Sequence, residues 1–260
     1  MLPEGERIAR AAAELLEARR SGTRLRSLPA ALVPGSEAEA YAIQQAQFSA
    51  MQLSIGGWKS TMFDALTGAY APIATSALLT SPTKLSAATA PSAGSSEFGI
   101  EPEIAFRMAR TVTALPTDPG ERRAAVIDAI ASAHAAIEIV VSRFVDPDAV
   151  SANERLADFL LNEALVVGPP CTDWRELDIS RLPLQVSVAG AQLYSGRGGH
   201  PLNDPLLPVI WLAGALLEHG SALKAGEVVT TGSCNGLRKI AAGQVVSADF
   251  GPLERAQVQF

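Results

Sequence analysis

The sequence contains little cysteine and little histidine, which limits the kinds of site it can hold. Its 260 residues include two cysteines, Cys171 and Cys234, and three histidines, His134, His200 and His219. The two thiols lack the spacing of a metal site, and the histidines form no obvious metal constellation. A disulfide framework is therefore excluded, and a reducing cytoplasm is the expected compartment.

Basic clusters and long apolar runs are also missing. The net charge is −6 and no cluster of lysine or arginine occurs, so we expect no nucleic acid as a partner. No apolar run is long enough to span a bilayer and the first residues lack a signal-peptide core, so we expect no membrane association. A hydrophobic content of 48% nevertheless provides ample material for a globular core.

Residues 1–55 have the pattern of a small helical part. An amphipathic helix is predicted over residues 6–20 and should end at Gly22. A second helix should begin at Ser36, which has capping-box spacing to Glu39. We expect this part to pack on the rest of the chain.

Residues 56–260 are expected to form the main domain, in which strands and helices are intermixed. Helices are predicted at 121–134, 152–161 and 205–220, and a loop that could contain a short strand at 80–96. Strands are predicted at 55–60, 99–106, 136–144, 164–167, 184–188, 191–194, 227–231, 244–250 and 255–260. Because the closing strands are not separated by helices, the pattern favours an α+β fold with a mixed, largely antiparallel sheet.

Two glutamates, Glu101 and Glu103, interrupt the apolar run at residues 99–106. Successive side chains of a strand alternate between faces, so both carboxylates should point the same way. Ile100 and Ile104 then cover the opposite face. Two like charges on one half-buried face repel each other and are costly to desolvate. A hard divalent cation between them is the simplest explanation.

Glu138 lies within the apolar strand predicted at 136–144 and is the third carboxylate of interest. A glutamate in such a strand either binds a metal or pairs with a basic residue, for which Arg107 and Arg143 are the candidates. Three carboxylates from two strands would suit Mg²⁺ or Mn²⁺. Both interpretations stay open at this point.

Two further features could contact a ligand. Lys59 follows two glycines and a tryptophan; beside a metal it could bind a substrate carboxylate or transfer a proton, and otherwise it is a solvated lysine at a strand end. The glycine-rich turn at 232–236 could hold a carboxylate through N–H groups and hydroxyls, or be an ordinary hairpin turn. It has neither the nucleophile-elbow nor the phosphate-loop spacing.

Many of these segments occur together, in this order, in one known family. They are residues 99–106, 136–140, 142–144, 162–168, 199–201, 211–213, 223–233 and 248–253. With Lys59 placed before the acidic strand, the chain resembles the fumarylacetoacetate hydrolase superfamily. It is most similar to the branch of 2-keto-4-pentenoate hydratases and 4-oxalocrotonate decarboxylases.

The resemblance implies a mixed β-roll core, a bound Mg²⁺ or Mn²⁺ and a homo-oligomer. The implied substrate is a short 2-keto or 2-hydroxydienoate acid from the catabolism of aromatic compounds. The implied metal ligands are Glu101, Glu103 and Glu138. The implied substrate-binding residues are Lys59, which is also the implied catalytic residue, Asn162, Thr231 and Gly232.

One departure from the family pattern leaves the reaction open. Hydratases of this branch often carry an acidic residue in the segment after the lysine strand, but residues 68–76 contain no carboxylate and Asp64 lies earlier. We expect a hydratase, with a decarboxylase of 4-oxalocrotonate type or an acylpyruvate-type hydrolase as alternatives. A catalytically inert keto-acid-binding or assembly subunit is a further alternative.

Overall fold

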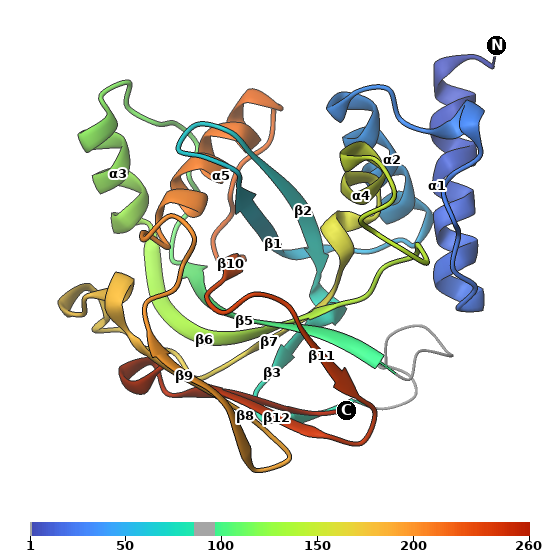
Figure 1. The fold of residues 1–260 in the computed structure, drawn as a ribbon. Coiled ribbons are helices and arrows are strands. Elements are labelled where there is room, and N and C mark those ends of the chain that lie inside the picture. Colours follow the sequence, from blue (N-terminus) through green and yellow to red (C-terminus); the bar gives the residue numbers. More distant parts are fainter. Residues whose placement is uncertain (1, 86–96) are drawn as a thin grey trace.

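The computed structural model describes residues 2–85 and 97–260, which form two β-sheets with flanking helices (Figure 1). The larger sheet contains β1 (Ile55–Met62), β2 (Gly68–Ala74), β3 (Leu78–Thr80), β5 (Glu97–Met108), β6 (Ile130–Val140), β7 (Asn162–Val167), β10 (Val228–Ser233) and β11 (Arg238–Ala241). The smaller sheet contains β4 (Thr83–Lys84), β8 (Pro183–Val188), β9 (Ala191–Arg197), β12 (Val245–Asp249) and β13 (Arg255–Gln259). The α-helices are α1 (Glu4–Ser21), α2 (Glu37–Ala50), α3 (Pro119–Asp128), α4 (Ala152–Ala157) and α5 (Leu207–Glu218).

The larger sheet has the strand order β2-β1-β10-β5-β6-β7-β3, with β11 paired to the first half of β5. The pairs β1–β10 and β3–β7 are parallel, whereas β1–β2, β10–β5, β5–β6 and β6–β7 are antiparallel. The prediction of a mixed, largely antiparallel sheet is therefore confirmed. This order places β10 beside the acidic strand β5, and β1, which is far from β10 in sequence, on the other side of β10.

The main hydrophobic core lies between the two sheets and extends to α5. From the larger sheet, Ile100, Ile104 and Phe106 of β5 are buried in it, and the smaller sheet contributes Val246 and Val258. Alternation along β5 sends its two glutamates to the opposite face, as predicted. The larger sheet therefore has one apolar face and one face that carries the carboxylates.

The helices α1, α2 and α4 lie together beside the larger sheet (Figure 1). A second hydrophobic cluster joins them through Leu15, Ile43 and Leu156, and Ala69 of β2 belongs to the same cluster. The two predicted N-terminal helices are confirmed: α1 ends at Gly22, whose φ of 71° suits glycine, and the Ser36 side chain caps α2. The division into residues 1–55 and 56–260 stays a prediction.

The helix predicted over 121–134 is wrong in its second half. α3 ends at Asp128 and β6 begins at Ile130, so Ala133 and Ala135 pair with β5 opposite Phe106 and Ile104. Cross-strand pairing along the whole length of β5 outweighs the helix preference of these alanines.

Three further differences concern short elements. The helix predicted over 152–161 ends at Ala157, and a one-turn 3-10 segment, Phe159–Leu161, follows. β2 and β11 have no counterpart among the predicted strands, because small and charged residues give them no alternating apolar pattern. β3 also has no predicted counterpart, whereas β4 lies in the segment at 80–96 that was predicted as a loop with room for a short strand; residues 86–96 of that segment lie outside the described residues.

No helix in residues 2–85 and 97–260 combines the length and the apolar character that crossing a membrane requires.

Candidate metal centre and substrate cavity

Three carboxylates converge on one face of the larger sheet. Glu101 and Glu138 are paired directly opposite each other on β5 and β6, and Glu103 follows on the same face of β5. One oxygen of each lies within 4.8 Å of the others. Glu103 and Glu138 are completely buried, whereas the side chain of Glu101 is 20% exposed. The sheet therefore presents a buried acidic group with one accessible member.

The protein environment opposes the ionisation of these carboxylates. Burial raises the pKa of Glu101 to about 7, and the charge of Lys59 counteracts this only in part. Burial likewise raises the pKa of Glu138 to about 7, again against the effect of Lys59, with Glu103 adding to the rise. Burial and the charge of Glu101 also raise the pKa of Glu103. A cation among the three would relieve this repulsion.

Lys59 is the one basic residue that forms ion pairs within this group among the described residues, with Glu138 and Glu101. Its Nζ lies 3.0 Å from Glu138 Oε2 and 3.7 Å from Glu101 Oε2. Burial alone would lower the pKa of Lys59, but the attraction of the carboxylates, Glu138 foremost, outweighs it and raises the pKa. The interpretation of Lys59 as a solvated strand-end residue is therefore wrong, since it is 8% exposed.

The other basic residues considered for Glu138 lie elsewhere. Arg143 pairs with Asp158 and Glu163, and Arg107 donates a hydrogen bond to the Gly226 carbonyl. A salt bridge from Glu138 to either arginine is therefore wrong.

Hydrogen bonds fix two of the carboxylates and leave an oxygen of each free to bind a cation. Glu103 Oε2 accepts from the Thr230 hydroxyl and, at 2.8 Å, from the Gly232 N–H, while its buried Oε1 has no hydrogen-bond partner among the described residues. Glu138 Oε1 accepts from Asn162 Nδ2 at 2.7 Å, and its Oε2 forms the ion pair with the Lys59 ammonium on the side of the other carboxylates. Oriented carboxylate oxygens of this kind fit a hard divalent cation.

The structure brings six of the seven predicted residues together, Gly232 through its N–H bond to Glu103, and separates the seventh. Lys59, the three glutamates and Asn162 touch as described, but the Thr231 hydroxyl donates to the Ile104 carbonyl. The neighbouring Thr230 holds Glu103 instead, because β10 pairs Thr230 with Lys59 and so places both side chains on the carboxylate face. Residues two apart in a strand lie on the same face, so Thr230, two residues before Gly232, could have been identified from the sequence.

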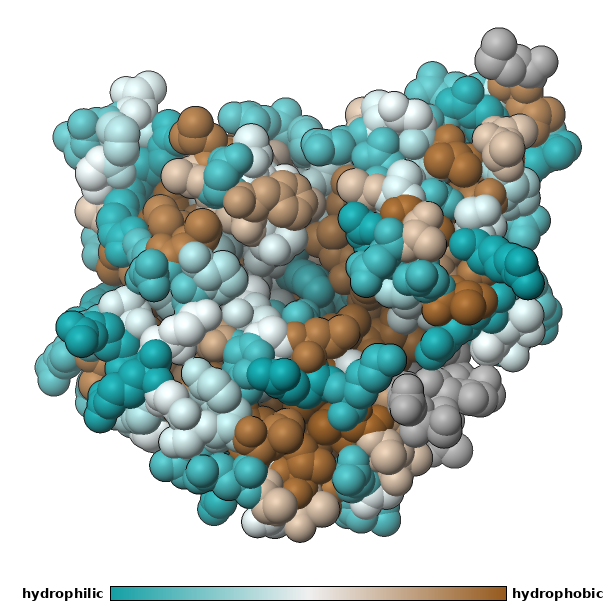
Figure 2. All heavy atoms as spheres, viewed as in Figure 1, coloured by the Kyte–Doolittle hydropathy of each residue, from teal (hydrophilic) through white to brown (hydrophobic). Residues whose placement is uncertain are grey.

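A cavity of about 280 Å³ opens over the carboxylates. Lys59, Glu101 and Glu103 line it at one side, and Leu160 and Leu161 provide apolar wall. Figure 2 shows the corresponding face of the molecule, hollowed between α5 and α4. A second cavity of about 410 Å³ shares Glu101 and Gly232 with the first. Substrate-sized space therefore lies directly next to the acidic group.

His200 lines the second cavity and is fixed by backbone groups. Its Nε2 donates to the Thr231 carbonyl at 2.8 Å, and its Nδ1 accepts from the Leu202 N–H. Burial lowers the pKa of His200, which keeps the ring neutral. The ring supports the turn after β10.

The Lys59 ammonium also donates to the carbonyl of Leu160, at 3.0 Å. That carbonyl belongs to a strained turn: Phe159, Leu160 and Leu161 have φ values of 54°, 52° and 66°. Left-handed conformations cost about 1–2 kcal/mol for such residues, so the surrounding contacts must impose them.

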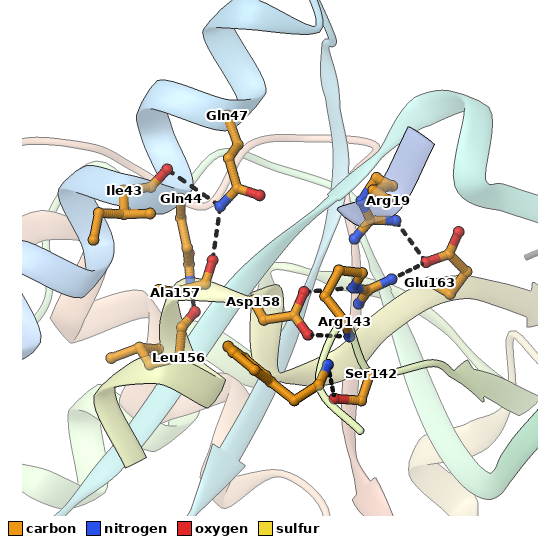
Figure 3. Close-up of polar contacts among 11 residues, drawn as sticks. Arg19, Ile43, Gln44, Gln47, Ser142, Arg143, Leu156, Ala157, Asp158 and Glu163 are labelled. Carbon is orange, nitrogen blue, oxygen red and sulfur yellow. Dashed lines mark hydrogen bonds and ion pairs between the residues drawn. The ribbon is translucent and has the colours of Figure 1, made fainter. Parts of the chain in front are cut away.

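A buried ionic network and two glutamines provide those contacts (Figure 3). Arg143 binds Asp158 at 2.6 Å, directly before the turn, and Glu163 at 2.5 Å, shortly after it. Arg19 of α1 binds Glu163 as well, at 2.5 Å. The turn is thus held at both ends by charge pairs, completely buried at Asp158 and partly exposed at Glu163.

The glutamines come from α2 and act at the end of α4. Gln44 donates to the Leu156 carbonyl, and Gln47 donates to the Ala157 carbonyl at 2.8 Å (Figure 3). These bonds satisfy carbonyls that α4 leaves open where it ends. The N-terminal helices therefore support the turn that contacts Lys59.

Residues 68–76, which follow the strand that carries Lys59, contain no acidic side chain. The residue paired with Lys59 there is Ala71, and Tyr70 beside it bonds His219 on the other face of the sheet. Asp64 is occupied in the exposed β1–β2 turn, where it accepts hydrogen bonds from Leu66 and Thr67. Asp64 is thus no substitute for the missing acid.

Comparison with known proteins agrees with this geometry. Residues 62–259 match the fumarylacetoacetate (FAA) hydrolase C-terminal family. A 2-keto-4-pentenoate hydratase of Burkholderia vietnamiensis (strain G4 / LMG 22486) is 30% identical over 161 residues, 62% of this chain and 60% of the relative. A 2-hydroxyhexa-2,4-dienoate hydratase of Comamonas testosteroni is 31% identical over 160 residues, 62% and 59% of the two chains. This chain thus spans about 60% of the length of these relatives.

Among solved structures, the 4-oxalocrotonate decarboxylase from Pseudomonas putida G7, complexed with magnesium and adipate, has a similar fold. The TM-score is 0.84 at 20% identity, and the match covers 100% of this chain and 99% of that one. The likeness extends over the whole of the architecture described above.

Proposed function

The chain belongs to the fumarylacetoacetate hydrolase family, and on that premise we propose that it is a divalent-metal-dependent lyase acting on a short 2-keto or 2-hydroxydienoate acid. The observation that carries the proposal is the group of three carboxylates, with unpartnered buried oxygens, beside a lysine and a cavity. The names of the relatives at about 30% identity support hydration of such an acid in aromatic catabolism.

Glu101, Glu103 and Glu138 would hold the metal, with Mg²⁺ or Mn²⁺ as candidates. When bound, such an ion supplies Lewis-acid stabilisation of negative charge on the oxygen next to the substrate carboxylate. Thr230, Gly232 and Asn162 keep the carboxylate oxygens oriented. The magnesium in the complex of the decarboxylase with a similar fold supports this assignment.

Lys59 would bind the acidic end of the substrate. Its ammonium lies in the cavity wall, and its raised pKa keeps it charged throughout the neutral range. The Leu160 carbonyl and Glu138 fix its position, so little side-chain entropy is lost on binding. We propose Lys59 as the catalytic residue that holds the developing enolate.

We propose supporting roles for the other predicted substrate-binding residues, Asn162, Thr231 and Gly232. Asn162 acts through Glu138, and Gly232 acts through Glu103 while its backbone borders the cavity. Thr231 borders the second cavity with its hydroxyl bound to the Ile104 carbonyl. These residues would shape the site, and Lys59 would contact the reacting part of the substrate.

Decarboxylation is the second candidate reaction. The missing acid after β1 and the complete overlap with the 4-oxalocrotonate decarboxylase fold favour it. The same electron-withdrawing site would stabilise the dienolate that forms when a carboxylate, linked to the keto group through a C=C bond, leaves as CO₂. A hydrolase of acylpyruvate type and an inert binding subunit stay as outcomes of the test.

Turnover after chelation tests the proposal. Protein treated with a chelator is assayed with 2-hydroxypenta-2,4-dienoate and with 4-oxalocrotonate, before and after Mg²⁺ or Mn²⁺ is added. We expect the metal to restore the conversion of at least one of them. Glu138→Gln should lose this response, whereas Glu39→Gln, at a buried glutamate of α2 paired with Arg7, should keep it. Metal binding without turnover of either compound would favour the inert subunit.

Two properties of the whole protein complete the proposal. We propose a cytoplasmic location, which the free thiols of Cys171 and Cys234 support. We also propose self-association, which the terminal strands of two open sheets make physically reasonable.

A further inference from the structure

The cavity over the carboxylates has a second cationic residue in its wall. Arg155 of α4 lines it, together with Lys59 and the acidic residues Glu101 and Glu103. No ion pair of Arg155 occurs among the described residues.

Arg155 is fixed in place by one side of its guanidinium group. Its Nη1 donates to the carbonyls of Pro147 and Val150, both at 2.9 Å. In the described chain, no residue accepts a hydrogen bond from its Nε or Nη2. An arginine held by one nitrogen, with the other two available, is pre-organised for a bidentate bond to a carboxylate.

The wall between the two charged regions is apolar. Val140, Leu160, Leu161 and Leu237 line the same cavity. A cavity of about 280 Å³ takes a ligand at the small end of the usual range. The complementary ligand is therefore short, with an apolar middle and a negative charge at each end.

We propose that Arg155 binds a second carboxylate of the substrate, at the end remote from the keto acid, and that the enzyme accepts 2-keto dicarboxylates. This inference rests on the proposed function, because Lys59 and the metal ligands must bind the first carboxylate. It favours a dicarboxylic substrate, and hence decarboxylation over hydration of a monocarboxylic dienoate.

Two keto acids of six carbons test Arg155. 2-Oxoadipate and 2-oxohexanoate differ only in a carboxylate or a methyl group at the far end. Their dissociation constants are measured calorimetrically with the full-length, magnesium-loaded protein. One charge-assisted hydrogen-bonded pair should make 2-oxoadipate bind at least about tenfold more tightly.

The variant Arg155→Gln separates recognition from support of the loop at 147–150. Glutamine keeps an N–H donor for the backbone carbonyls but loses the charge. We expect the preference for 2-oxoadipate to disappear while the affinity for 2-oxohexanoate changes by less than about threefold. Arg123→Gln, which removes an arginine paired with Asp204 away from this cavity, should leave the preference unchanged.

Three outcomes would overturn the inference. Equal affinities of the original protein for the two acids would show that no second carboxylate is recognised. A preference that survives Arg155→Gln, or an equal loss of affinity for both acids, would give Arg155 a purely structural role. If neither acid binds the magnesium-loaded protein, the proposed function fails together with the inference.

Discussion

Replacing Glu138 with glutamine should stabilise the metal-free protein at neutral and alkaline pH. Glu138 is completely buried, and its pKa is raised from 4.5 to about 7 even with Lys59 at 3.0 Å. At about 1.4 kcal/mol per pKa unit, ionisation of Glu138 costs the fold about 3 kcal/mol. Glutamine has the same shape and can accept the hydrogen bond of Asn162 without the charge.

The sign of the pH dependence follows from this shift. The folded state holds the proton on Glu138 more tightly than the unfolded state does. The stability that this provides is complete below about pH 4.5 and is lost as the pH rises through about 7. The advantage of Glu138→Gln should therefore be small at about pH 5 and reach up to about 3 kcal/mol at about pH 8.

Urea unfolding in the presence of a chelator, at both pH values, measures this difference. Glu163→Gln is the matched control with the opposite sign. Burial alone would raise the pKa of Glu163, but Arg19 and Arg143 outweigh it and lower the pKa. This control should therefore destabilise the protein at about pH 8. A loss of stability in Glu138→Gln as well would refute the reasoning and make the Lys59–Glu138 pair a structural salt bridge.

Three other changes have defined outcomes. Lys59→Met should weaken binding of a 2-keto acid by at least about tenfold but should not weaken Mn²⁺ binding, since it removes a positive charge from the site; weaker Mn²⁺ binding in titration calorimetry would contradict this. Arg143→Gln leaves the buried charge of Asp158 unpaired, while Glu163 keeps its pair with Arg19, and should cost about 3–5 kcal/mol in urea unfolding; a change below about 1 kcal/mol would show that the network contributes little. Burial raises the pKa of Cys234 to about 12, so native protein should resist alkylation by iodoacetamide there at about pH 8; rapid labelling of Cys234 detected by mass spectrometry would contradict its burial.

Local pattern was sufficient to predict part of the site. The spacing of Glu101 and Glu103 placed both carboxylates on one face, because strand alternation is independent of the rest of the fold. The apolar residues on either side of the pair, Ile100 and Ile104, were correctly predicted to face away from the carboxylates, and they lie in the core. Glu138 could be singled out as an unusual glutamate, but its position opposite Glu101 depends on the register of two strands.

The remaining features depend on contacts between distant segments. Lys59 is buried because β1 lies parallel to β10, whose residue Thr230 is its partner. The strained turn at Leu160 depends on Arg143 and on glutamines of α2, and no local pattern near residue 160 indicates them. In the sequence alone, Arg155 is an ordinary helical arginine; its place in the cavity wall follows from the position of α4. These facts follow from the assembled sheet and helices.

The central claim is that Glu101, Glu103 and Glu138 bind one divalent cation. Anomalous diffraction at the manganese edge, from crystals soaked in Mn²⁺, tests it directly. The account predicts a single strong peak within bonding distance of all three carboxylates, and its absence in crystals of Glu138→Gln. Crystals of the unchanged protein with no peak there, and with Lys59 still paired to Glu138, would contradict it.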